Sequence, residues 1–560
     1  MTEQCVPGEK TAPAPELLAR VRSWIAADPD PETRDELKRL IACNDGEAMA
    51  ARFESPLTFG TAGLRGAIGA GPHRMNRVVV AHASAGLAAY LNEQGDVTPR
   101  VVVGCDARTN SEVFARVTAE VLAGAGCEVI LLPAELPTPV LAFAVRHLSA
   151  AAGVMVTASH NPAGDNGYKV YLGGSSEGAQ IISPTDKEIE ALIVKASATA
   201  FNDIPRRPVD TIASDIVAKY AVATAAAVGP RWATGAPTPV NDEDALRVVY
   251  TPLHGVGLAT FHAVLSAAGY AMPAVVAEQA LADPAFPTVA YPNPEEDGAL
   301  DLAMALARRE DADLIVANDP DADRLAIAVP DSSTSTGYRM LTGDELGILL
   351  AWWAAERARS AGRTGALATT VVSAPALERL AERYGLECRR TLSGFKWIGR
   401  VPHLNYGYEE ALGYLVNPET LRDKDGISAA LAVLEIAHSL RAEGSSIARK
   451  VQALAAEFGG VYGTSFSVRD ESREKLAQRM DALRASPPAE LAGRTLSRVD
   501  DYGNGLDGLP TTNLLAWHLE DGSRVMIRPS GTEPKLKFYV HANSRTEAEE
   551  IAQALRAQAV

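Results

Sequence analysis

Short apolar runs rich in β-branched residues alternate with helix-patterned stretches along this chain. The first three runs are RVVVGCD at 100–106, CEVILLP at 127–133 and AGVMVTAS at 152–159. Helical periodicity fills the stretches before and between them, as in VVVAHASAGLAAYL and SEVFARVTAEVLAGAG. Continuous apolar runs are typical of strands that are buried on both faces. The alternation therefore predicts α/β units with a mostly parallel sheet.

The same alternation of strand-like and helix-like stretches recurs further along the chain. A strand and turn at 247–257 precede a helix at 258–268, a strand follows at 312–318, and another strand at 365–375 precedes a helix. The C-terminal part differs, because a helix at 474–485 is followed by two strands around a turn and by a closing helix. We therefore expect three α/β domains with mixed sheets and a smaller C-terminal α+β domain.

The length of 560 residues exceeds what one hydrophobic core usually supports, which agrees with several domains. The expected boundaries are 1–212, including a helical N-terminal extension, then 213–335, 336–455 and 456–560.

The net charge of the chain limits the kinds of molecule that it is expected to bind. Asp and Glu number 70 against 53 Lys and Arg, which gives a net charge of −17. Such a chain favours neither nucleic acid nor anionic membranes, so any phosphate site must be built locally from Arg, Lys and backbone N–H groups. We expect no membrane helix and no secretory signal. Five scattered cysteines form no metal motif, so a reducing cytoplasm is the simplest location.

A tight polar loop follows the strand that ends at Val156. It reads TASHNP, and Pro162 restricts Asn161 to extended or turn geometry. Loops at the ends of sheet strands are where α/β proteins bind ligands, so Ser159 is a candidate nucleophile or phosphoryl carrier. His160 and Lys169 are near enough in sequence to shape such a site. The alternative is an ordinary polar loop in which His160 bonds the backbone.

A second loop carries three carboxylates at alternate positions, Asp319, Asp321 and Asp323, followed by Arg324. In extended backbone these three side chains would point the same way, and their repulsion would be relieved by a cation. Hard carboxylate oxygens suit Mg²⁺, which could then hold a phosphoryl group. The alternatives are a solvated acidic turn and a calcium loop, although the glycine and flanking helices of an EF-hand are missing.

A third loop lies between the strands RVMIRPS and KLKFYV. Its candidate phosphate ligands are Arg528, Ser530, Gly531, Thr532 and Lys535. A glycine in such a turn lets consecutive N–H groups form an anion-binding concavity, to which Arg528 adds bidentate donors. The alternative is a plain hairpin with incidental polar residues.

Other glycine-bounded stretches present charged side chains. These are Arg65, Lys396, the pair Glu409 and Glu410, and the run Arg422, Lys424 and Asp425. Carboxylates such as Glu409 commonly hold sugar hydroxyls, but each stretch alone is equally consistent with solvated loop charges.

Taken in order, these loops resemble the α-D-phosphohexomutase superfamily. The matching motifs, which span about residues 55–545, are FGTAGLRG, TASHNP, YTPLHGVG, DPDADR, SGFKWI, the Gly-Tyr-Glu-Glu sugar loop and RPSGTEPK. The resemblance implies four domains around a central cleft, each of which contributes one loop. It also implies a phosphosugar mutase that works through a phosphoserine and a sugar bisphosphate.

The resemblance further implies roles for individual residues. Ser159 would carry the phosphoryl group, and Asp319, Asp321 and Asp323 would hold Mg²⁺ together with the serine phosphate. Arg65 and Arg324 would stabilise transferring charge, His160 would orient the serine loop, and Lys169 would be a general acid/base with a lowered pKa. Lys396 and Glu409 would bind sugar, and the Arg528 loop would hold the phosphate that does not react.

One position departs from the pattern of many family members. Ala411 stands where they have a serine, so one hydroxyl contact to the sugar is lost. The implied activity is interconversion of glucose or mannose 1-phosphate and 6-phosphate, with a sugar 1,6-bisphosphate as activator. Alternatives are a phosphopentomutase, a hexose 1,6-bisphosphate synthase and a non-catalytic sugar-phosphate sensor. We expect a small phosphorylated sugar as partner and a monomer or small homo-oligomer.

Overall fold

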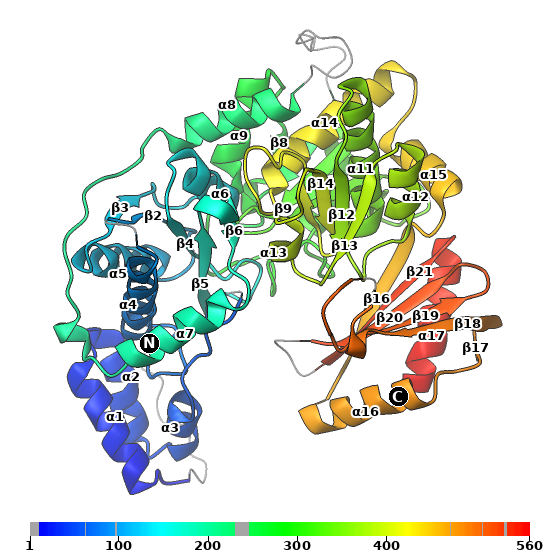
Figure 1. The fold of residues 1–560 in the computed structure, drawn as a ribbon. Coiled ribbons are helices and arrows are strands. Elements are labelled where there is room, and N and C mark those ends of the chain that lie inside the picture. The colour runs from blue at the N-terminus through cyan, green and yellow to red at the C-terminus, as the bar shows by residue number, and fades with distance from the viewer. Residues whose placement is uncertain are drawn as a thin grey trace.

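The computed structural model describes residues 11–61, 63–95, 98–229, 246–470, 472–506, 508–530 and 535–559. Four sheets follow one another along the chain. In Figure 1 the first unit, in blue and cyan, and the C-terminal unit, in orange and red, lie on opposite sides, with the second and third units between them. No helix in the described ranges is long and apolar enough to cross a membrane.

Three helices precede the first sheet. They are α1 (Pro15–Ala27), α2 (Pro31–Ala42) and α3 (Gly46–Phe53). Asp30 caps α2 by accepting from the Glu32 N–H, with Pro31 at the first helical position. Val21, Leu37, Met49 and Phe53 form a small core of their own. The expected helical extension is therefore confirmed.

The first sheet has the order β1-β5-β4-β2-β3, with β6 paired to β5. Strands β2, β3 and β4 are parallel, whereas β5 runs antiparallel to β4 and β1. Helices α4, α5 and α7 pack together, and α6 packs on β2 and β4. The bounds are β1 Leu64–Ala67, α4 Arg77–Glu93, β2 Arg100–Cys105, α5 Ser111–Gly124, β3 Glu128–Leu131, α6 Thr138–His147, β4 Ala152–Val156, β5 Asp165–Leu172, β6 Ala179–Gln180 and α7 Thr185–Ala196.

The second sheet repeats this plan in the order β11-β10-β9-β7-β8, with β10 antiparallel to both of its neighbours. The bounds are α8 Ile216–Val228, β7 Val248–Thr251, α9 Gly257–Ala268, β8 Ala274–Val275, α10 Asp301–Glu310, β9 Leu314–Asn318, β10 Leu325–Pro330 and β11 Tyr338–Met340. The 230–239 stretch, where we expect a loop, lies outside the described residues.

The third sheet has the order β13-β12-β14-β15, and only β15 is antiparallel to its neighbour. Its bounds are α11 Gly343–Ser360, β12 Ala366–Thr370, α12 Ala376–Arg383, β13 Glu387–Thr391, α13 Phe395–Ile398, β14 Leu404–Glu409, β15 Gly413–Leu415, α14 Gly426–Ala442 and α15 Ile447–Phe458. Thr342 and Glu345 form a capping box that begins α11.

The C-terminal sheet is antiparallel throughout, in the order β16-β21-β20-β19-β18-β17. Its bounds are β16 Tyr462–Arg469, α16 Arg473–Ala485, β17 Glu490–Leu491, β18 Arg494–Asp501, β19 Leu515–Leu519, β20 Arg524–Pro529, β21 Lys535–Ala542 and α17 Arg545–Ala559. This unit has its own core, whereas one continuous core includes Val102 of β2, Val316 of β9 and Leu367 of β12.

The expected mixed sheets are confirmed, although the apolar runs alone predict a mostly parallel arrangement. Strands β2–β4, β7–β9 and β12–β14 are parallel within their sheets. Each of these sheets also has an antiparallel strand, namely β5 and β10 in the interior of their sheets and β15 at an edge. Hairpin loops of this kind need no crossover helix and so leave no helical signature in the sequence. All four candidate loops lie at such strand connections, β4–β5, β9–β10, β14–β15 and β20–β21.

Candidate active site

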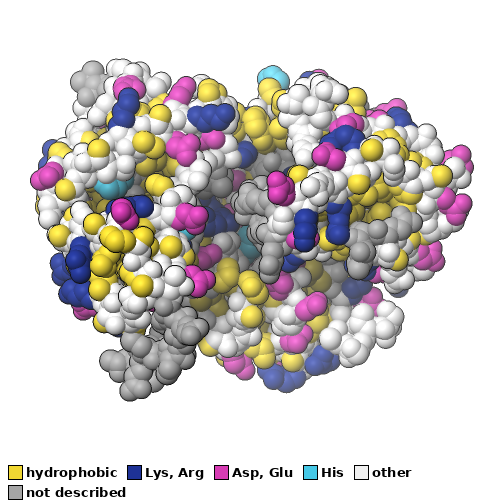
Figure 2. Space-filling model, turned by 90° about the horizontal axis from the view of Figure 1, so that it is seen from below, with side chains coloured by type: hydrophobic (Ala, Val, Ile, Leu, Met, Phe, Trp, Pro, Cys, Tyr) yellow, Lys and Arg dark blue, Asp and Glu magenta, His cyan; other side chains and the backbone are white. Residues whose placement is uncertain are grey.

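The loops of the first three units meet through direct contacts. Ser159 of the first unit contacts Asp319 of the second, and Lys424 of the third contacts Asp323 of the second. Seen from below, the molecule has a hollow near its middle, in which Lys, Arg and His side chains are visible (Figure 2). The structure therefore brings these sequence-predicted residues together in one place.

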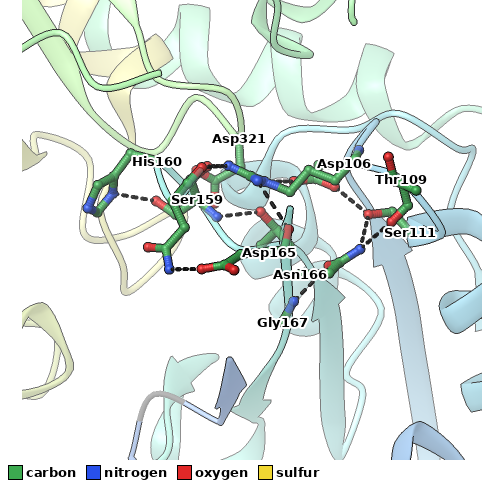
Figure 3. Close-up of polar contacts among 12 residues, drawn as sticks. Asp106, Thr109, Ser111, Ser159, His160, Asp165, Asn166, Gly167 and Asp321 are labelled. Atoms are coloured by element: carbon green, nitrogen blue, oxygen red, sulfur yellow. Dashed lines mark hydrogen bonds and ion pairs between the residues drawn. The ribbon is translucent and has the colours of Figure 1, made fainter. Parts of the chain in front are cut away.

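Ser159 occupies a tight turn between β4 and β5. Its backbone is in the left-handed region with φ 54°, which is uncommon for a residue with a side chain, and the residue is only 3% exposed. Its Oγ donates to Asp319 Oδ2 at 3.0 Å. The same oxygen lies 3.2 Å from His160 Nδ1 (Figure 3). Burial and neighbouring cations keep the pKa of His160 well below its usual value, so its imidazole is neutral. The serine oxygen thus faces a carboxylate and a neutral imidazole.

Asp319, Asp321 and Asp323 can place one carboxylate oxygen each within 4.8 Å of one another, and all three are fully buried. The convergence was predicted, but its expected cause was wrong. A turn with Ala322 at φ 52°, rather than extended backbone, gathers the three side chains. Burial and the other two carboxylates raise the pKa of Asp319 well above its usual range. This cluster could bind a metal ion.

Two lysines face the carboxylate cluster. Lys169 Nζ lies 2.8 Å from Asp321 Oδ2 and 3.1 Å from Asp323 Oδ2, and Lys424 Nζ lies 3.3 Å from Asp323 Oδ2. Burial lowers the pKa of Lys169, but Asp321 and Asp323 outweigh it and raise the pKa above its usual value. The lowered pKa expected for Lys169 is therefore wrong for this geometry, because two carboxylates hold its proton.

Arg65 and Arg324 flank the same loops. Arg65 Nη1 donates to Asn161 Oδ1 at 3.0 Å, which connects it to the serine loop. The Arg324 backbone N–H donates to Asp319 Oδ1 at 3.0 Å, and its Nη1 lies 4.0 Å from Glu295 Oε2. No sequence motif pointed to Glu295. The stretch PNPEED around it gives no signal beyond that of a loop.

The two glutamates of the β14–β15 loop differ in their partners. Glu410 Oε2 accepts from Thr370 Oγ1 at 3.0 Å and from Ser373 Oγ at 2.9 Å, so it is held by its own unit. Burial raises the pKa of Glu409 to about 7, against the opposing effect of Lys424. Glu409 is thus distinguished by its raised pKa, and Ala411, beside the two glutamates, adds no polar group.

Lys396 and the charged residues that follow β15, Arg422, Lys424 and Asp425, make different kinds of contact. Lys396 of α13 donates to Thr61 Oγ1 and so connects the third unit to the first. Arg422 pairs with Glu177 at 2.7 Å, another connection between these units. Asp425 accepts from the Ile427 and Ser428 N–H groups and caps α14. Arg422 and Asp425 are therefore structural, whereas Lys424 belongs to the site.

The strand ends that flank the β20–β21 loop carry cationic side chains, Arg528 on β20 and Lys535 and Lys537 on β21. Lys535 O accepts from the Ser530 N–H at 2.8 Å, and Arg528 Nε is buried without a hydrogen-bond partner among the described residues. Gly531 and Thr532 lie outside the described residues. Burial, Lys535 and Arg528 lower the pKa of Lys537, a residue that the sequence did not single out. Cations that repel one another in this way form a site suited to an anion.

A buried serine beside a carboxylate cluster, together with cationic residues that flank the β20–β21 loop, provides the groups that an enzyme of the phosphoryl-transfer class needs. Comparisons with known proteins agree with this description. Family models of the phosphoglucomutase/phosphomannomutase α/β/α domains I, II and III match residues 56–200, 235–332 and 342–458. The model of the C-terminal domain of that family matches residues 468–558.

Individual relatives give the same picture. A protein of Haemophilus influenzae named "Probable phosphomannomutase" is 46% identical over 84% of this chain and 93% of its own length. The "Phosphopentomutase" of Homo sapiens is 34% identical over 92% of this chain and 90% of its own. The crystal structure of a "putative phosphomannomutase" from Thermus thermophilus has a TM-score of 0.69 at 27% identity, covering 90% of this chain and 99% of that one. The chain belongs to the phosphoglucomutase/phosphomannomutase family and is a phosphosugar mutase.

Proposed function

We propose that this enzyme interconverts the 1-phosphate and 6-phosphate of glucose, mannose or both, through a phosphorylated Ser159 and a sugar 1,6-bisphosphate intermediate. The observation that carries the proposal is the placement of Ser159 Oγ, 3.0 Å from Asp319 in a buried carboxylate cluster. A serine in that place is a weak nucleophile, but once phosphorylated it is a phosphoryl donor. A small phosphorylated sugar is the proposed partner, and the cytoplasm is the proposed location.

The carboxylate cluster fits Mg²⁺. Asp321 Oδ1 and Asp323 Oδ1 are buried and have no hydrogen-bond partner among the described residues, so each has an oxygen available for a cation. Asp319, Asp321 and Asp323 would hold the ion together with a phosphate oxygen of Ser159. Bound there, Mg²⁺ would neutralise negative charge on the phosphoryl group during its transfer.

The protein's own groups would manage the proton and the remaining charge. In the first transfer the bond between Ser159 Oγ and phosphorus breaks while a sugar hydroxyl oxygen bonds to phosphorus. That hydroxyl loses its proton and Ser159 Oγ gains one, so the proton from the sugar hydroxyl would restore the group that gives its proton to Oγ. Lys169, kept protonated by Asp321 and Asp323, is the proposed source of the proton for Ser159 Oγ. Arg65 and Arg324 would stabilise the transferring charge, and His160 would orient the serine.

The remaining loops would hold the rest of the substrate. Glu409 and Lys396 would bind sugar hydroxyls near Ala411. The phosphate that does not react would bind the C-terminal loop, through Arg528, Ser530, Gly531, Thr532 and Lys535. After the first transfer the bisphosphate would turn over, so that its other phosphate returns to Ser159. Proposed domain boundaries are 1–212, 213–335, 336–455 and 456–560.

A pentose 1-phosphate to 5-phosphate mutase is the second candidate. Two observations favour it. Relatives named phosphopentomutase or phosphoribomutase align over more than nine-tenths of this chain. Ala411 also removes a hydroxyl from the sugar loop, and a pentose has fewer hydroxyl groups to bind than a hexose.

The test uses the purified enzyme with Mg²⁺, a trace of glucose 1,6-bisphosphate, and in turn the 1-phosphates of glucose, mannose and ribose. Products are followed by phosphorus NMR. We expect isomerisation that falls by at least about 10³-fold in Ser159→Ala, because the phosphoryl carrier is lost. Ser197→Ala, an exposed serine on the first unit, should behave as wild type. Relative rates identify the sugar, and no isomerisation of any of the three would contradict both candidates.

A further inference from the structure

We propose that Arg108 is a positioning residue that holds the Ser159 turn in its left-handed conformation and so sets the rate of phosphoryl transfer. The inference rests on the proposed function, since it concerns the carrier serine of that reaction. Arg108 follows β2 and is 4% exposed. It matched none of the motifs that pointed to the site.

The Ser159 turn needs support from outside itself. A left-handed backbone is unfavourable for a residue with a Cβ atom and persists only where the surrounding structure enforces it. Within the turn, the Ser159 N–H donates to Thr157 Oγ1 at 2.8 Å, and the Asn161 N–H donates to Ala158 O at 3.1 Å. The Pro162 carbonyl also accepts from the Asp165 N–H at 3.1 Å, whereas no backbone N–H in the described residues of the turn donates to the carbonyls of Ser159 and Asn161, which therefore need other donors.

Arg108 supplies those donors. Its Nη2 donates to Ser159 O and to Asn161 O, each at 2.6 Å. Its Nη1 donates to Pro162 O at 2.8 Å and to Asp165 O at 3.2 Å. One guanidinium therefore bonds four carbonyls on both sides of the turn. A planar fork of donors can do this, whereas the compact ammonium of a lysine cannot.

The guanidinium is fixed in turn by two further contacts. Asp106 lies 3.5 Å from Arg108 Nε, and its other oxygen accepts from the Arg108 N–H and from Ser111 Oγ at 2.6 Å. Figure 3 shows Asp106 and Ser111 on the side of the turn away from His160. The Phe286 ring, from the second unit, lies 5.0 Å from the guanidinium carbon. Arg108 thus spans the unit with the serine and the unit with the carboxylates.

The contacts of Arg108 predict an effect on the position of Ser159 and not on the binding of the sugar phosphate. Arg108 bonds the main-chain carbonyls of the turn, and none of these four hydrogen bonds involves the Ser159 hydroxyl. Loss of the guanidinium would let the turn relax and would move Oγ away from its aligned position. Small displacements of a reacting atom are costly in rate, so kcat should fall while KM for the sugar phosphate changes little.

The test compares Arg108→Ala, Arg108→Lys and Phe286→Leu with wild type, and uses Arg116→Ala, an exposed arginine on α5, as the matched control. Three quantities are measured: kcat and KM of isomerisation, the melting temperature, and the rate of Ser159 phosphorylation by glucose 1,6-bisphosphate. Intact mass follows the last reaction, in which a phosphoryl group moves to Ser159 Oγ and the hydroxyl proton goes to the sugar oxygen.

We expect both Arg108 variants to lose roughly 100-fold in kcat and in phosphorylation rate, with KM within about threefold of wild type. Phe286→Leu should lose severalfold in kcat, and Arg116→Ala should match wild type. Added methylguanidinium should restore at least about tenfold of the Arg108→Ala rate, because it can occupy the vacated place. It should restore nothing in Ser159→Ala.

The inference would be overturned by a folded Arg108→Ala enzyme with wild-type kcat, by a loss confined to KM, or by no rescue. If both Arg108 variants fail to fold, Phe286→Leu decides, and an unchanged kcat contradicts the inference. If wild type isomerises no sugar yet accepts phosphate on Ser159, the proposed function is wrong, and phosphorylation rates alone test Arg108. If wild type accepts no phosphate, both proposals are wrong.

Discussion

Glu409 is a residue whose charge changes near neutral pH. Burial raises the pKa of its side chain to about 7, although Lys424 acts in the opposite direction. A carboxylate accepts hydrogen bonds from sugar hydroxyls more strongly than a protonated carboxyl does. Sugar binding should therefore strengthen as the pH rises through 7. The effect on stability has the opposite sign, because the folded state binds this proton more tightly, so stability falls as the pH rises from about 4.3 to 7.

Glu409→Gln tests this at constant size. The amide cannot ionise, so KM should rise roughly tenfold at pH 8, and the dependence of KM on pH near 7 should flatten. The substrate phosphate also titrates near pH 6, but that titration remains in the variant and serves as an internal reference. Kinetics between pH 5.5 and 8.5 give the answer. A variant profile that still turns at pH 7 would assign the group to another residue.

At the scale of elements, the same connection, a loop between two adjacent antiparallel strands, occurs at all four candidate loops. Each candidate loop joins two strands that pair antiparallel with each other, at β4–β5, β9–β10, β14–β15 and β20–β21. Both ends of such a loop are anchored by neighbouring strands, so few backbone states remain open to it. Left-handed residues at Ser159, Ala322 and Leu412 give three of these loops their tight turns.

The β9–β10 loop predicts a metal-dependent stability. Because its carboxylates repel one another, an ion that binds only the folded state should raise the melting temperature, by roughly 2–4 °C at Mg²⁺ concentrations far above the dissociation constant. Chelation with EDTA should remove both this rise and the activity. Asp323→Asn should weaken Mg²⁺ binding by at least about tenfold in calorimetric titration.

The matched control is Asp311→Asn, whose side chain is 85% exposed at the end of α10 in the same unit. Its response to Mg²⁺ should equal that of wild type. An equal loss of Mg²⁺ binding in both variants would show that general surface charge, and not the cluster, binds the ion.

Residues that act through their own side chains were within reach of sequence reasoning. Ser159 and the three aspartates lie in short polar loops between strongly apolar strands, which is a visible pattern. Arg108 could not be found from the sequence. It bonds main-chain carbonyls 51 or more positions away, and every residue has such a carbonyl. The pairing of Lys424 with Asp323 was also hidden, because it depends on how the second and third units pack. The antiparallel strands β5, β10 and β15 were hidden as well, because strand direction leaves no mark on their apolar composition.

At the scale of the whole molecule, the C-terminal unit stands apart. The other three units share a continuous core. Most buried apolar residues of the C-terminal unit form a core of their own, and a smaller apolar cluster that includes Val371, Val372 and Met526 joins this unit to the third. The C-terminal unit joins the third unit partly through polar contacts, including His541 Nε2 to Asp344 Oδ2 at 2.9 Å. The charge of this unit nevertheless acts on the candidate active site. Burial raises the pKa of Glu295, which lies beside Arg324, and Lys537 of the C-terminal unit acts against that rise. Interfaces between domains of one chain generally permit relative motion of the domains unless they are large and apolar.

Arg528→Ala tests how the separate unit serves the reaction. If the non-reacting phosphate always binds the C-terminal loop, the loop must accept the 6-phosphate in one transfer and the 1-phosphate in the other. Loss of Arg528 should then raise KM by roughly 10–100-fold for both the 1-phosphate and the 6-phosphate substrate, and by similar factors. Arg498→Ala, an exposed arginine in the same sheet, is the control. Initial rates in the two directions measure the effect. A loss in one direction only would mean that the two phosphates use different sites, and the turnover of a bisphosphate between Ser159 and a single cradle would have to be abandoned.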